Sequence, residues 1–246
     1  MIIMSGLCVQ RSVGKGESQM AGRKKDPIAT EATRQRILET AFALFSQKNI
    51  ESVSMGEIAK ACGIATMTVY RYFSTKPKLA VAVATWKWAS LIEDNRKYRP
   101  RPDFEGMTAA EVFDFFLDSF LRLYRDNRDI LCFNQFFNIY VQSENIDETT
   151  IRPYGDLIRA FAERFHIIYE KALLDRTIRT DVPEEEMFRT TLHLMLAAVT
   201  RYAVGLVYKP ENEDDAMKEL KTLKRALLHE YAVSSEFGTE ILDETA

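Results

Sequence analysis

Five hydrogen-bonding side chains fall within one short stretch of this chain, and their types suggest what they could bind. They are Thr66, Thr68, Tyr70, Arg71 and Tyr72. Hydroxyl, phenol and guanidinium groups suit hydrogen bonds to phosphate oxygens and to the edges of bases. The chemistry of this cluster therefore favours recognition of nucleic acid.

Two short helices with a turn between them must position the cluster. Ser54 and Glu57 have the spacing of a capping box, which predicts a helix that starts near Met55. Gly63 can adopt the left-handed conformation that ends this helix, and residues 66–73 have room for about two more turns. This layout is typical of a helix-turn-helix DNA reader, although an ordinary helical hairpin with a solvated face is the alternative. The predicted DNA contacts are Ser54, Met55, Thr66, Thr68, Tyr70, Arg71, Tyr72 and Lys76.

An apolar pattern upstream predicts a further helix that supports the reader. Thr30 offers a helix cap, and apolar residues then repeat at helical spacing as far as residue 47. They are Ile37, Leu38, Ala41, Leu44 and Phe45. Together with Val69 and Phe73, which are four residues apart, they predict the core of a three-helix unit.

Residues 31–79 resemble the N-terminal domain of the TetR family of transcriptional regulators. The shared pattern runs from an alanine and a Leu-Phe pair, through the turn and the reading helix, to a lysine and a leucine. The matching residues are Ala41, Leu44, Phe45, Ser54, Ile58, Ala59, Ala61, Gly63, Ile64, Thr68, Val69, Tyr70, Tyr72, Phe73, Lys76 and Leu79. The resemblance covers about 50 of the 246 residues.

Three positions depart from the family pattern. Asn49 stands where glycine is usual, Ala65 where a capping Ser or Thr is common, and Pro77 where an acid is frequent. Asparagine tolerates the left-handed conformation, Thr66 could cap in place of Ala65, and proline is allowed in a first helical turn. We therefore expect all the helices to form, with one phosphate contact in doubt at Ala65.

Charge is segregated along the chain, whose net charge is only −3. Residues 21–80 hold 10 Lys or Arg against 5 Asp or Glu, a net charge of +5, whereas residues 81–246 hold 21 against 30, a net charge of −9. Duplex DNA releases its counterions when cationic groups bind it. A basic reader on an acidic body therefore predicts DNA binding that weakens steeply with salt.

The sequence gives no support for catalysis or for a metal site. It contains no Gly-rich phosphate loop, no HExxH motif and no arranged nucleophile, and its SxxK pair, Ser12 and Lys15, lies in the predicted tail. The cysteines and histidines lack ligand spacing: Cys8, Cys62, Cys132, His166, His193 and His229. We predict a protein that is not an enzyme, with no metal and no cofactor.

Helical patterns continue beyond the reader without strand alternation. A long helix is predicted from a cap at Ser74 to about Tyr98, where the sequence RPRP ends it. Further helices are predicted near 109–126, 128–142, 152–176, 183–207 and 213–233. The predicted fold is all-α, with an N-terminal helix-turn-helix domain joined by the long helix to a C-terminal ligand-binding and dimerisation domain. The predicted boundaries are a basic tail at 1–25, the DNA-binding domain at 26–76 and the effector-binding and dimerisation domain at 77–246.

The C-terminal domain is dense in aromatic residues between 113 and 169. Two interpretations remain open, namely a tightly packed core without a cavity and a pocket for an apolar or aromatic effector. The TetR resemblance favours the pocket, because the family binds its effectors in these helices. The predicted pocket residues are Phe116, Phe120, Phe133, Phe137, Tyr140, Phe161 and Phe165.

The last two predicted helices, 183–207 and 213–233, are amphipathic. In the TetR family such helices pair with their copies in a four-helix dimer interface, although a purely intramolecular role is the alternative. The resemblance therefore implies a homodimer that reads two half-sites of a palindromic operator, about one helical turn or a multiple of it apart.

The predicted function is sequence-specific transcription regulation, with double-stranded DNA and a small, largely apolar effector as partners. We expect a repressor that the effector releases from its operator. Two alternatives are a DNA-bound adaptor whose C-terminal body binds a protein, and an all-α enzyme that uses the aromatic cavity.

The first residues predict a flexible tail, because they lack periodicity and are rich in small, polar and basic side chains. Arg23, Lys24 and Lys25 could reach the DNA backbone or a minor groove, or could only solubilise the chain. Because the short apolar opening lacks a basic segment and is too short to span a bilayer, we expect a cytoplasmic protein without a membrane anchor.

Overall fold

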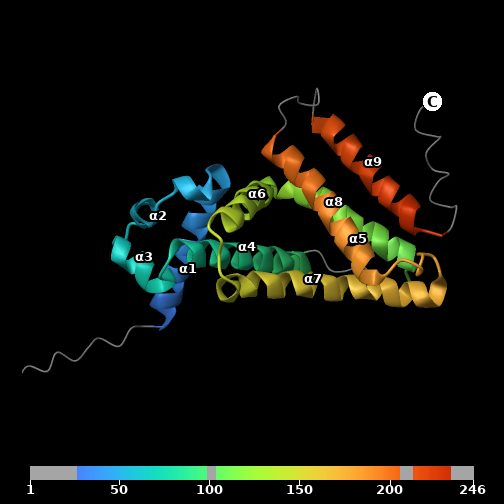
Figure 1. Ribbon diagram of the computed structural model, residues 1–246, viewed down its shortest axis with the longest axis horizontal. Helices are drawn as coiled ribbons and strands as arrows, with labels where there is room; N and C mark the ends of the chain where they lie inside the picture. Colours follow the sequence, from blue (N-terminus) through green and yellow to red (C-terminus); the bar gives the residue numbers. More distant parts are fainter. Residues whose placement is uncertain (1–26, 99–103, 206–212, 234–246) are drawn as a thin grey trace, which may run out of the picture.

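The computed structural model describes residues 27–98, 104–205 and 213–233 (Figure 1). Across these ranges the chain forms nine α-helices and one short 3-10 helix, without a β-strand. The elements are α1 (Pro27–Gln47), η1 (Ile50–Ser52), α2 (Met55–Ala61), α3 (Thr66–Phe73), α4 (Lys76–Tyr98), α5 (Ala109–Asp126), α6 (Arg128–Ser143), α7 (Glu148–Asp175), α8 (Glu184–Val204) and α9 (Glu213–Tyr231). The predicted all-α fold is confirmed.

The helices α1, α2 and α3 form a small unit at one end of the molecule (Figure 1). Ile37 and Phe45 of α1, Ile58 of α2 and Val69 of α3 are all 0% exposed and form its core. The capping box that the sequence predicts at the start of α2 is present. Gly63 ends α2 with a φ of +67°, a conformation that glycine adopts without a steric cost. The predicted basic tail lies outside the described residues.

The long helix α4 connects this unit to the remaining helices. Its first half packs against α1, whereas α7 runs beside it along the body (Figure 1). Leu79 and Val83 are 0% exposed in the part that faces the reader. The same helix therefore contributes to the packing of both parts of the molecule.

The body consists of α5 to α9. Helix α6 packs against α1 on one side and against α8 on the other, and α5 contacts α7, α8 and α9. The predicted helix positions agree with the structure to within a few residues, and the largest difference is at α7, which starts at Glu148 instead of near 152. Asp147 caps α7 about one turn before the predicted start, and Pro153 lies inside the helix. No helix in the described parts of the chain is long and apolar enough to cross a membrane.

Four predictions about local caps are wrong. Thr30 lies inside α1, which already starts at Pro27, so it does not cap that helix. Asn49 is not left-handed, since its φ is −54°, and its side chain instead accepts a hydrogen bond from the N–H of Glu51. Thr66 is the first residue of α3 and does not cap it; the cap position is Ala65. Ser74 ends α3 with a φ of 54°, and the hydroxyl of Thr75 accepts the hydrogen bond at the start of α4.

Candidate DNA-binding surface and ligand cavity

The short helix α3 has one buried face and one face towards solvent. Val69 and Phe73 are 0% and 6% exposed, and they anchor the helix in the core of the reader. The predicted contacts on α3 lie outside this core, with Thr66, Tyr70 and Arg71 exposed and Thr68 and Tyr72 half-buried. The guanidinium of Arg71 lies 5.7 Å from the centre of the Tyr72 ring, which holds it along the helix surface. The helix thus presents hydroxyl, phenol and guanidinium groups together.

Ser54 lies at the exposed start of α2. Its Oγ accepts a hydrogen bond from the N–H of Glu57 at 3.1 Å, and the Glu57 carboxylate accepts one from the Ser54 N–H at 2.8 Å. The hydrogen bonds from the backbone and side chain of Ser54 lower the pKa of Glu57.

Two other predicted DNA contacts, Met55 and Lys76, do not lie on the free surface of the reader. Met55 is 4% exposed and packs in the reader core, so the prediction that it contacts DNA is wrong. Lys76 donates from Nζ to the carbonyl oxygen of Glu51 at 3.0 Å, and the same Nζ lies 5.6 Å from the centre of the Tyr140 ring. Burial lowers the pKa of Lys76. Its ammonium group therefore joins the reader to α6, which does not match the predicted contact with DNA.

Sequence reasoning omitted Met67, whose side chain is 75% exposed on α3. Met67 and Arg71 are four residues apart and share a helix face. Helical spacing could have identified Met67, since it lies about 200° around the helix from the buried Val69. An exposed apolar side chain beside polar ones can pack against the methyl group of thymine.

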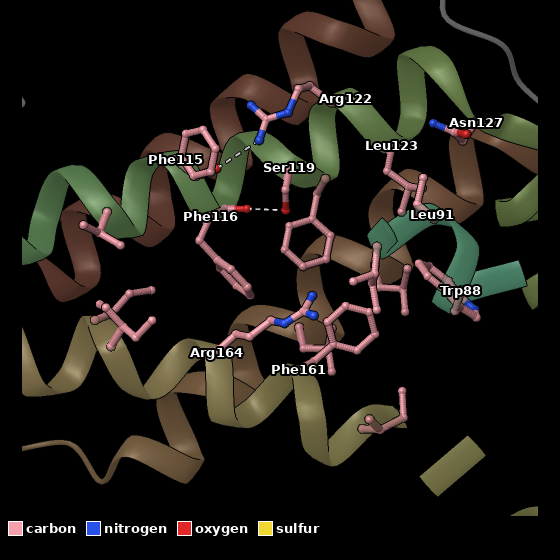
Figure 2. Close-up of a pocket in the computed structure, with 18 of the residues that line it drawn as sticks. Trp88, Leu91, Phe115, Phe116, Ser119, Arg122, Leu123, Asn127, Phe161 and Arg164 are labelled. Carbon is pink, nitrogen blue, oxygen red and sulfur yellow. Dashed lines mark hydrogen bonds between the residues drawn. The ribbon is translucent and has the colours of Figure 1, made fainter. Parts of the chain in front are cut away.

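A cavity of about 390 Å³ lies among α4, α5, α7 and α8 (Figure 2). Its volume falls in the range of about 300–1,000 Å³ that is typical of small-molecule sites. Most of the lining is aromatic or aliphatic. The lining residues are Trp88, Leu91, Ile92, Phe104, Val112, Phe115, Phe116, Ser119, Phe120, Arg122, Leu123, Asn127, Tyr154, Ile158, Phe161, Arg164, Ile167, Ile168, Leu192 and Leu196.

Three of the predicted pocket residues line this cavity, namely Phe116, Phe120 and Phe161. Phe165 lies behind the lining, where it is 0% exposed and packs edge-on against Phe116 with ring centres 5.3 Å apart. Phe165 thus supports the wall of the cavity, and the prediction that it lines the pocket is wrong.

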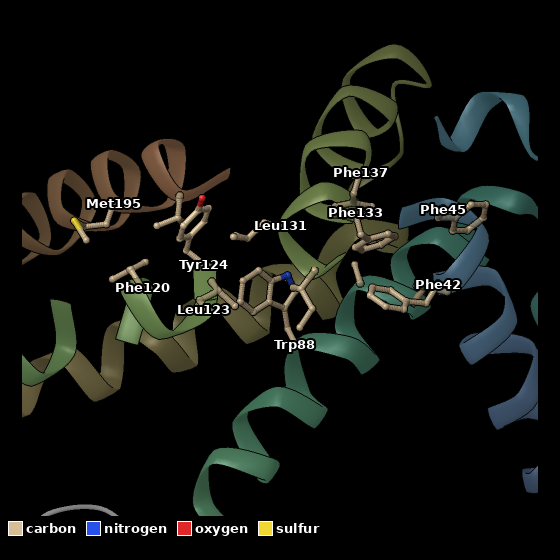
Figure 3. Packing of buried hydrophobic residues seen from close by; sticks show 14 of the residues in the cluster. Phe42, Phe45, Trp88, Phe120, Leu123, Tyr124, Leu131, Phe133, Phe137 and Met195 are labelled. Carbon is tan, nitrogen blue, oxygen red and sulfur yellow. The ribbon is translucent and has the colours of Figure 1, made fainter. Parts of the chain in front are cut away.

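The other three predicted pocket residues lie on α6, outside this lining. Phe133 faces Phe42 of α1 (Figure 3), whereas Phe137 packs against Phe133 and against Tyr154 of α7. The ring of Phe133 lies 5.5 Å from the ring of Phe42 on α1 and 5.8 Å from that of Phe137, while Tyr140 is 1% exposed under Lys76. The prediction that Phe133, Phe137 and Tyr140 line the pocket is wrong, because α6 packs directly on α1.

Polar contacts reinforce this joint between α6 and the reader. The Ser143 hydroxyl donates to Oε1 of Glu51 at 2.6 Å, which connects the end of α6 to η1. Nearby, Nζ of Lys87 on α4 lies 4.4 Å from the centre of the Phe42 ring. We refer to Phe42, Phe133 and these polar contacts as the reader–body joint.

Sequence reasoning did not find the contribution of α4 to the cavity. Trp88, Leu91 and Ile92 lie in the second half of this helix and form part of the wall. Trp88 packs edge-on against Phe161 of α7 at 6.1 Å between ring centres. The apolar residues of α4 read as ordinary core, and only the packing of four separate helices brings them together around a cavity.

The two helices of the predicted dimer interface present different outer faces. On α8 the exposed residues Leu194, Ala197, Arg201 and Val204 recur at helical spacing and form a mostly apolar stripe. Leu194 and Val204 are each 46% exposed. The outer face of α9 is polar, with Lys218, Lys221 and Arg225 among its exposed residues.

Within the described ranges, no group of three His, Cys, Asp or Glu side chains could hold a metal ion. Cys62 is buried, and Cys132 is half-buried with its Sγ 3.5 Å from the carbonyl oxygen of Ala203. Burial raises the pKa of the Cys132 thiol, which keeps it protonated and unreactive.

Comparisons with known proteins agree with the geometry of the reader. Residues 37–83 match the family described as bacterial regulatory proteins, tetR family. The HTH-type transcriptional regulator YvdT of Bacillus subtilis (strain 168) is 27% identical over 204 residues, which cover 82% of this chain and 98% of YvdT. The regulator AcrR of Shigella flexneri is 43% identical over 56 residues, which cover 23% of this chain and 26% of AcrR.

The similarity extends through the body at the level of the fold. The crystal structure of the transcriptional regulator FadR from Bacillus subtilis, in complex with stearoyl-CoA, has a TM-score of 0.58 to this chain at 16% identity and covers 80% of it and 96% of FadR. The matched relatives are transcription regulators and not enzymes. Residues 37–83 thus form a DNA-binding domain of the TetR family, and the curated relatives, together with the fold of the body, support a transcription regulator of that family.

Proposed function

We propose that the protein is a repressor that a small, largely apolar effector releases from a palindromic operator. The observation that carries this proposal is the course of α4. Leu79 and Val83 of α4 belong to its part that faces the reader, while Trp88, Leu91 and Ile92 line the cavity. A ligand that favours a different position of α4 would therefore change the position of the reader.

The exposed face of α3 supports its role as the reading helix. Thr66, Thr68, Tyr70, Arg71 and Tyr72 lie outside the buried core of the unit, and Ser54 lies at the nearby start of α2. Their donors suit phosphate oxygens and base edges in a major groove. The net charge of +5 over residues 21–80 adds a general attraction to duplex DNA.

Control by an effector requires a difference in its affinity for two conformations. A ~100-fold loss of operator affinity needs about 2.7 kcal/mol of coupling between the two sites. The cavity between α4 and α7 is suited to this role, because ligand contacts there act on a helix that packs on both parts. A mostly apolar cavity of this size also favours a small-molecule effector over the adaptor alternative, in which a protein would bind the body.

The exposed stripe on α8 supports a homodimer. Helices α8 and α9 pack against each other, and the residues Leu194, Ala197 and Val204 remain on the solvent side of α8 in one subunit. Pairing these helices with their copies would cover the stripe in a four-helix arrangement. A symmetric dimer would place two copies of α3 for two half-sites.

The proposal is tested by screening small molecules for release of a fluorescent operator duplex from the protein. Ile158→Trp replaces an aliphatic side chain of the cavity wall with a bulky indole ring that fills part of the cavity. Glu163→Trp places the same indole ring on the exposed side of α7 and serves as the control. An effector that acts through the cavity should release DNA from wild type and from Glu163→Trp, but only weakly from Ile158→Trp. Equal release from all three proteins would contradict the role of the cavity.

A further inference from the structure

The charged residues in the cavity wall carry the same sign. Arg122 of α5 and Arg164 of α7 line the cavity from different helices, and no Asp or Glu occurs among the described residues that line it (Figure 2). This composition is the reverse of the body as a whole, in which residues 81–246 carry a net charge of −9. The cavity is therefore locally cationic within an acidic domain.

The geometry of the two arginines keeps them in the wall. The guanidinium of Arg122 lies 4.7 Å from the centre of the Phe115 ring, and its Nη2 donates to the Phe115 carbonyl oxygen at 3.4 Å. In Figure 2 the side chain of Arg164 extends across the floor of the cavity towards Phe161. Both arginines are half-buried, so solvent screens their charges less than those of exposed arginines.

The remaining residues of the cavity lining are mostly apolar and suit an apolar part of a ligand. Aromatic and aliphatic side chains such as Phe116, Phe120 and Ile158 offer apolar surface. Tyr154 also lines the cavity, and burial raises its pKa to about 12, so it stays neutral at physiological pH and adds no negative charge. The lining thus combines a large apolar surface with two fixed cations.

Resting on the proposed ligand role of the cavity, we propose that its effector is an amphipathic anion, with an apolar body and one carboxylate or phosphate headgroup. The apolar body lies against the aromatic wall, and the headgroup lies near Arg164, which extends across the cavity; Arg122 lies apart from it, turned towards Phe115, and adds positive charge to the α5 side of the wall (Figure 2). A guanidinium suits both headgroups, because its planar N–H groups match two oxygens at once. A cationic molecule of the same shape is disfavoured by like-charge repulsion.

Binding of four ligands that share one alkyl chain tests the proposal: decanoate, decyl phosphate, 1-decanol and decyltrimethylammonium. The chain has two tryptophans, and Trp88 lines the cavity whereas Trp86 does not. The full-length Trp86→Phe variant therefore reports on the cavity through the fluorescence of Trp88. We expect at least one of the anions to bind about tenfold more tightly than decanol, and the cation to bind most weakly. The tighter of the two anions identifies the headgroup.

Three variants examine the role of the arginines, each checked for folding by circular dichroism. The double change Arg122→Gln and Arg164→Gln should bring anions and decanol to similar affinity, whereas Arg164→Lys should keep the preference for anions. Arg159→Gln lies on the exposed side of α7, the helix that carries Arg164, and should change neither the affinity for the anions nor that for decanol. If the double variant does not fold, the ligand series on the Trp86→Phe protein still decides the question.

Two results would overturn the proposal, and they differ in what they leave standing. Equal or tighter binding of decanol or of the cation would refute an anionic effector but keep the cavity as a ligand site. If none of the four ligands changed the Trp88 fluorescence or the melting temperature, both the anionic effector and the proposed role of the cavity would fail.

Discussion

The residues of α3 serve packing or recognition according to their place around the helix. Val69 and Phe73 hold the helix in the core, while Thr66, Tyr70 and Arg71 remain exposed. Among these, we expect Arg71 to make the strongest contact with DNA, because it carries a full charge and a planar set of donors. Its position on the exposed face makes it the most informative single residue of the reader.

We expect Arg71→Ala to weaken operator binding. If Arg71 reads a base edge, the loss of binding free energy should be about 1–3 kcal/mol and the sequence preference should relax. If Arg71 instead holds a phosphate, the slope of log affinity against log salt concentration should fall by about 1. Fluorescence anisotropy with operator and unrelated duplexes at several salt concentrations separates the two cases. Arg159→Ala removes an exposed arginine from the body and serves as the control. If Arg71→Ala binds the operator as wild type does, Arg71 is not a DNA contact.

Asp147 gives a prediction about pH. Its carboxylate caps α7 and accepts hydrogen bonds from the hydroxyls of Thr149 and Thr150 and from the N–H of Thr150, which lowers its pKa from 3.8 to about 2. Because the folded state holds the ionised form, this contribution to stability is present above pH 3.8 and is lost as the pH falls towards 2.

Thermal melts of wild type and Asp147→Ala should therefore differ near neutral pH and converge as the pH falls from about 4 to about 2. Glu148→Gln removes the neighbouring charge without removing the cap, so its difference from wild type should not follow this pattern. A difference between wild type and Asp147→Ala that stays constant across the pH range would contradict the assignment of the cap.

At the scale of elements, α6 decides how the reader and the body are connected. It presents Phe133 to α1 and Tyr140 to Lys76 at the start of α4. The sequence predicted this helix almost to the residue but assigned its aromatic face to the ligand pocket. The reader–body joint therefore uses residues that a sequence pattern alone cannot separate from cavity residues.

The contact between Phe42 and Phe133 should couple the stabilities of the two parts. In a double-mutant cycle, Phe42→Leu and Phe133→Leu should show an interaction of about 0.5–1.5 kcal/mol, since the rings lie 5.5 Å apart. Urea unfolding measures the four free energies of the cycle. The pair Phe42 and Phe113, which lie in different parts of the core, is the control and should be additive. Additive effects for Phe42 and Phe133 would show that the rings do not connect the reader to the body.

Most helices could be predicted from the sequence, because their apolar spacing and end signals are local. The capping box at Ser54 and Glu57, the turn at Gly63 and the end of α4 at Tyr98 are examples. The predictions that Thr66 caps α3 and that Ser74 caps α4 were wrong, because the neighbouring residues Ala65 and Thr75 take these positions. The cavity could be predicted only in part, since its wall comes from four helices and includes Trp88, Arg122 and Arg164, which have no common sequence signal. The domain boundaries and the DNA contacts other than Met55 and Lys76 remain predictions.

At the scale of the whole molecule, the proposed operator recognition requires two readers. We expect the protein to be a dimer at micromolar concentration, and Leu194→Glu to convert it to a monomer because it places a charge in the exposed stripe of α8. Light scattering coupled to size-exclusion chromatography measures the mass. Leu174→Glu is the matched control, since Leu174 is 86% exposed at the end of α7. A monomeric wild type would refute the dimer, and a dimeric Leu194→Glu would place the interface elsewhere.

The segregation of charge is also a property of the whole molecule. The basic segment 21–80 and the acidic segment 81–246 orient the chain towards DNA, because the body is repelled by phosphates and the reader is attracted. Counterion release then makes binding depend on salt in proportion to the number of phosphates contacted.

The most direct test of the account is a fluorescence-anisotropy titration of the full-length protein with a duplex from upstream of its own gene. The titration is repeated with an unrelated duplex of equal length, each at about 50 mM and about 200 mM salt. We predict tight binding that is selective for the upstream duplex and weakens steeply at the higher salt concentration. Equal, weak binding to both duplexes with little response to salt would contradict the assignment of α3 as an operator-reading helix.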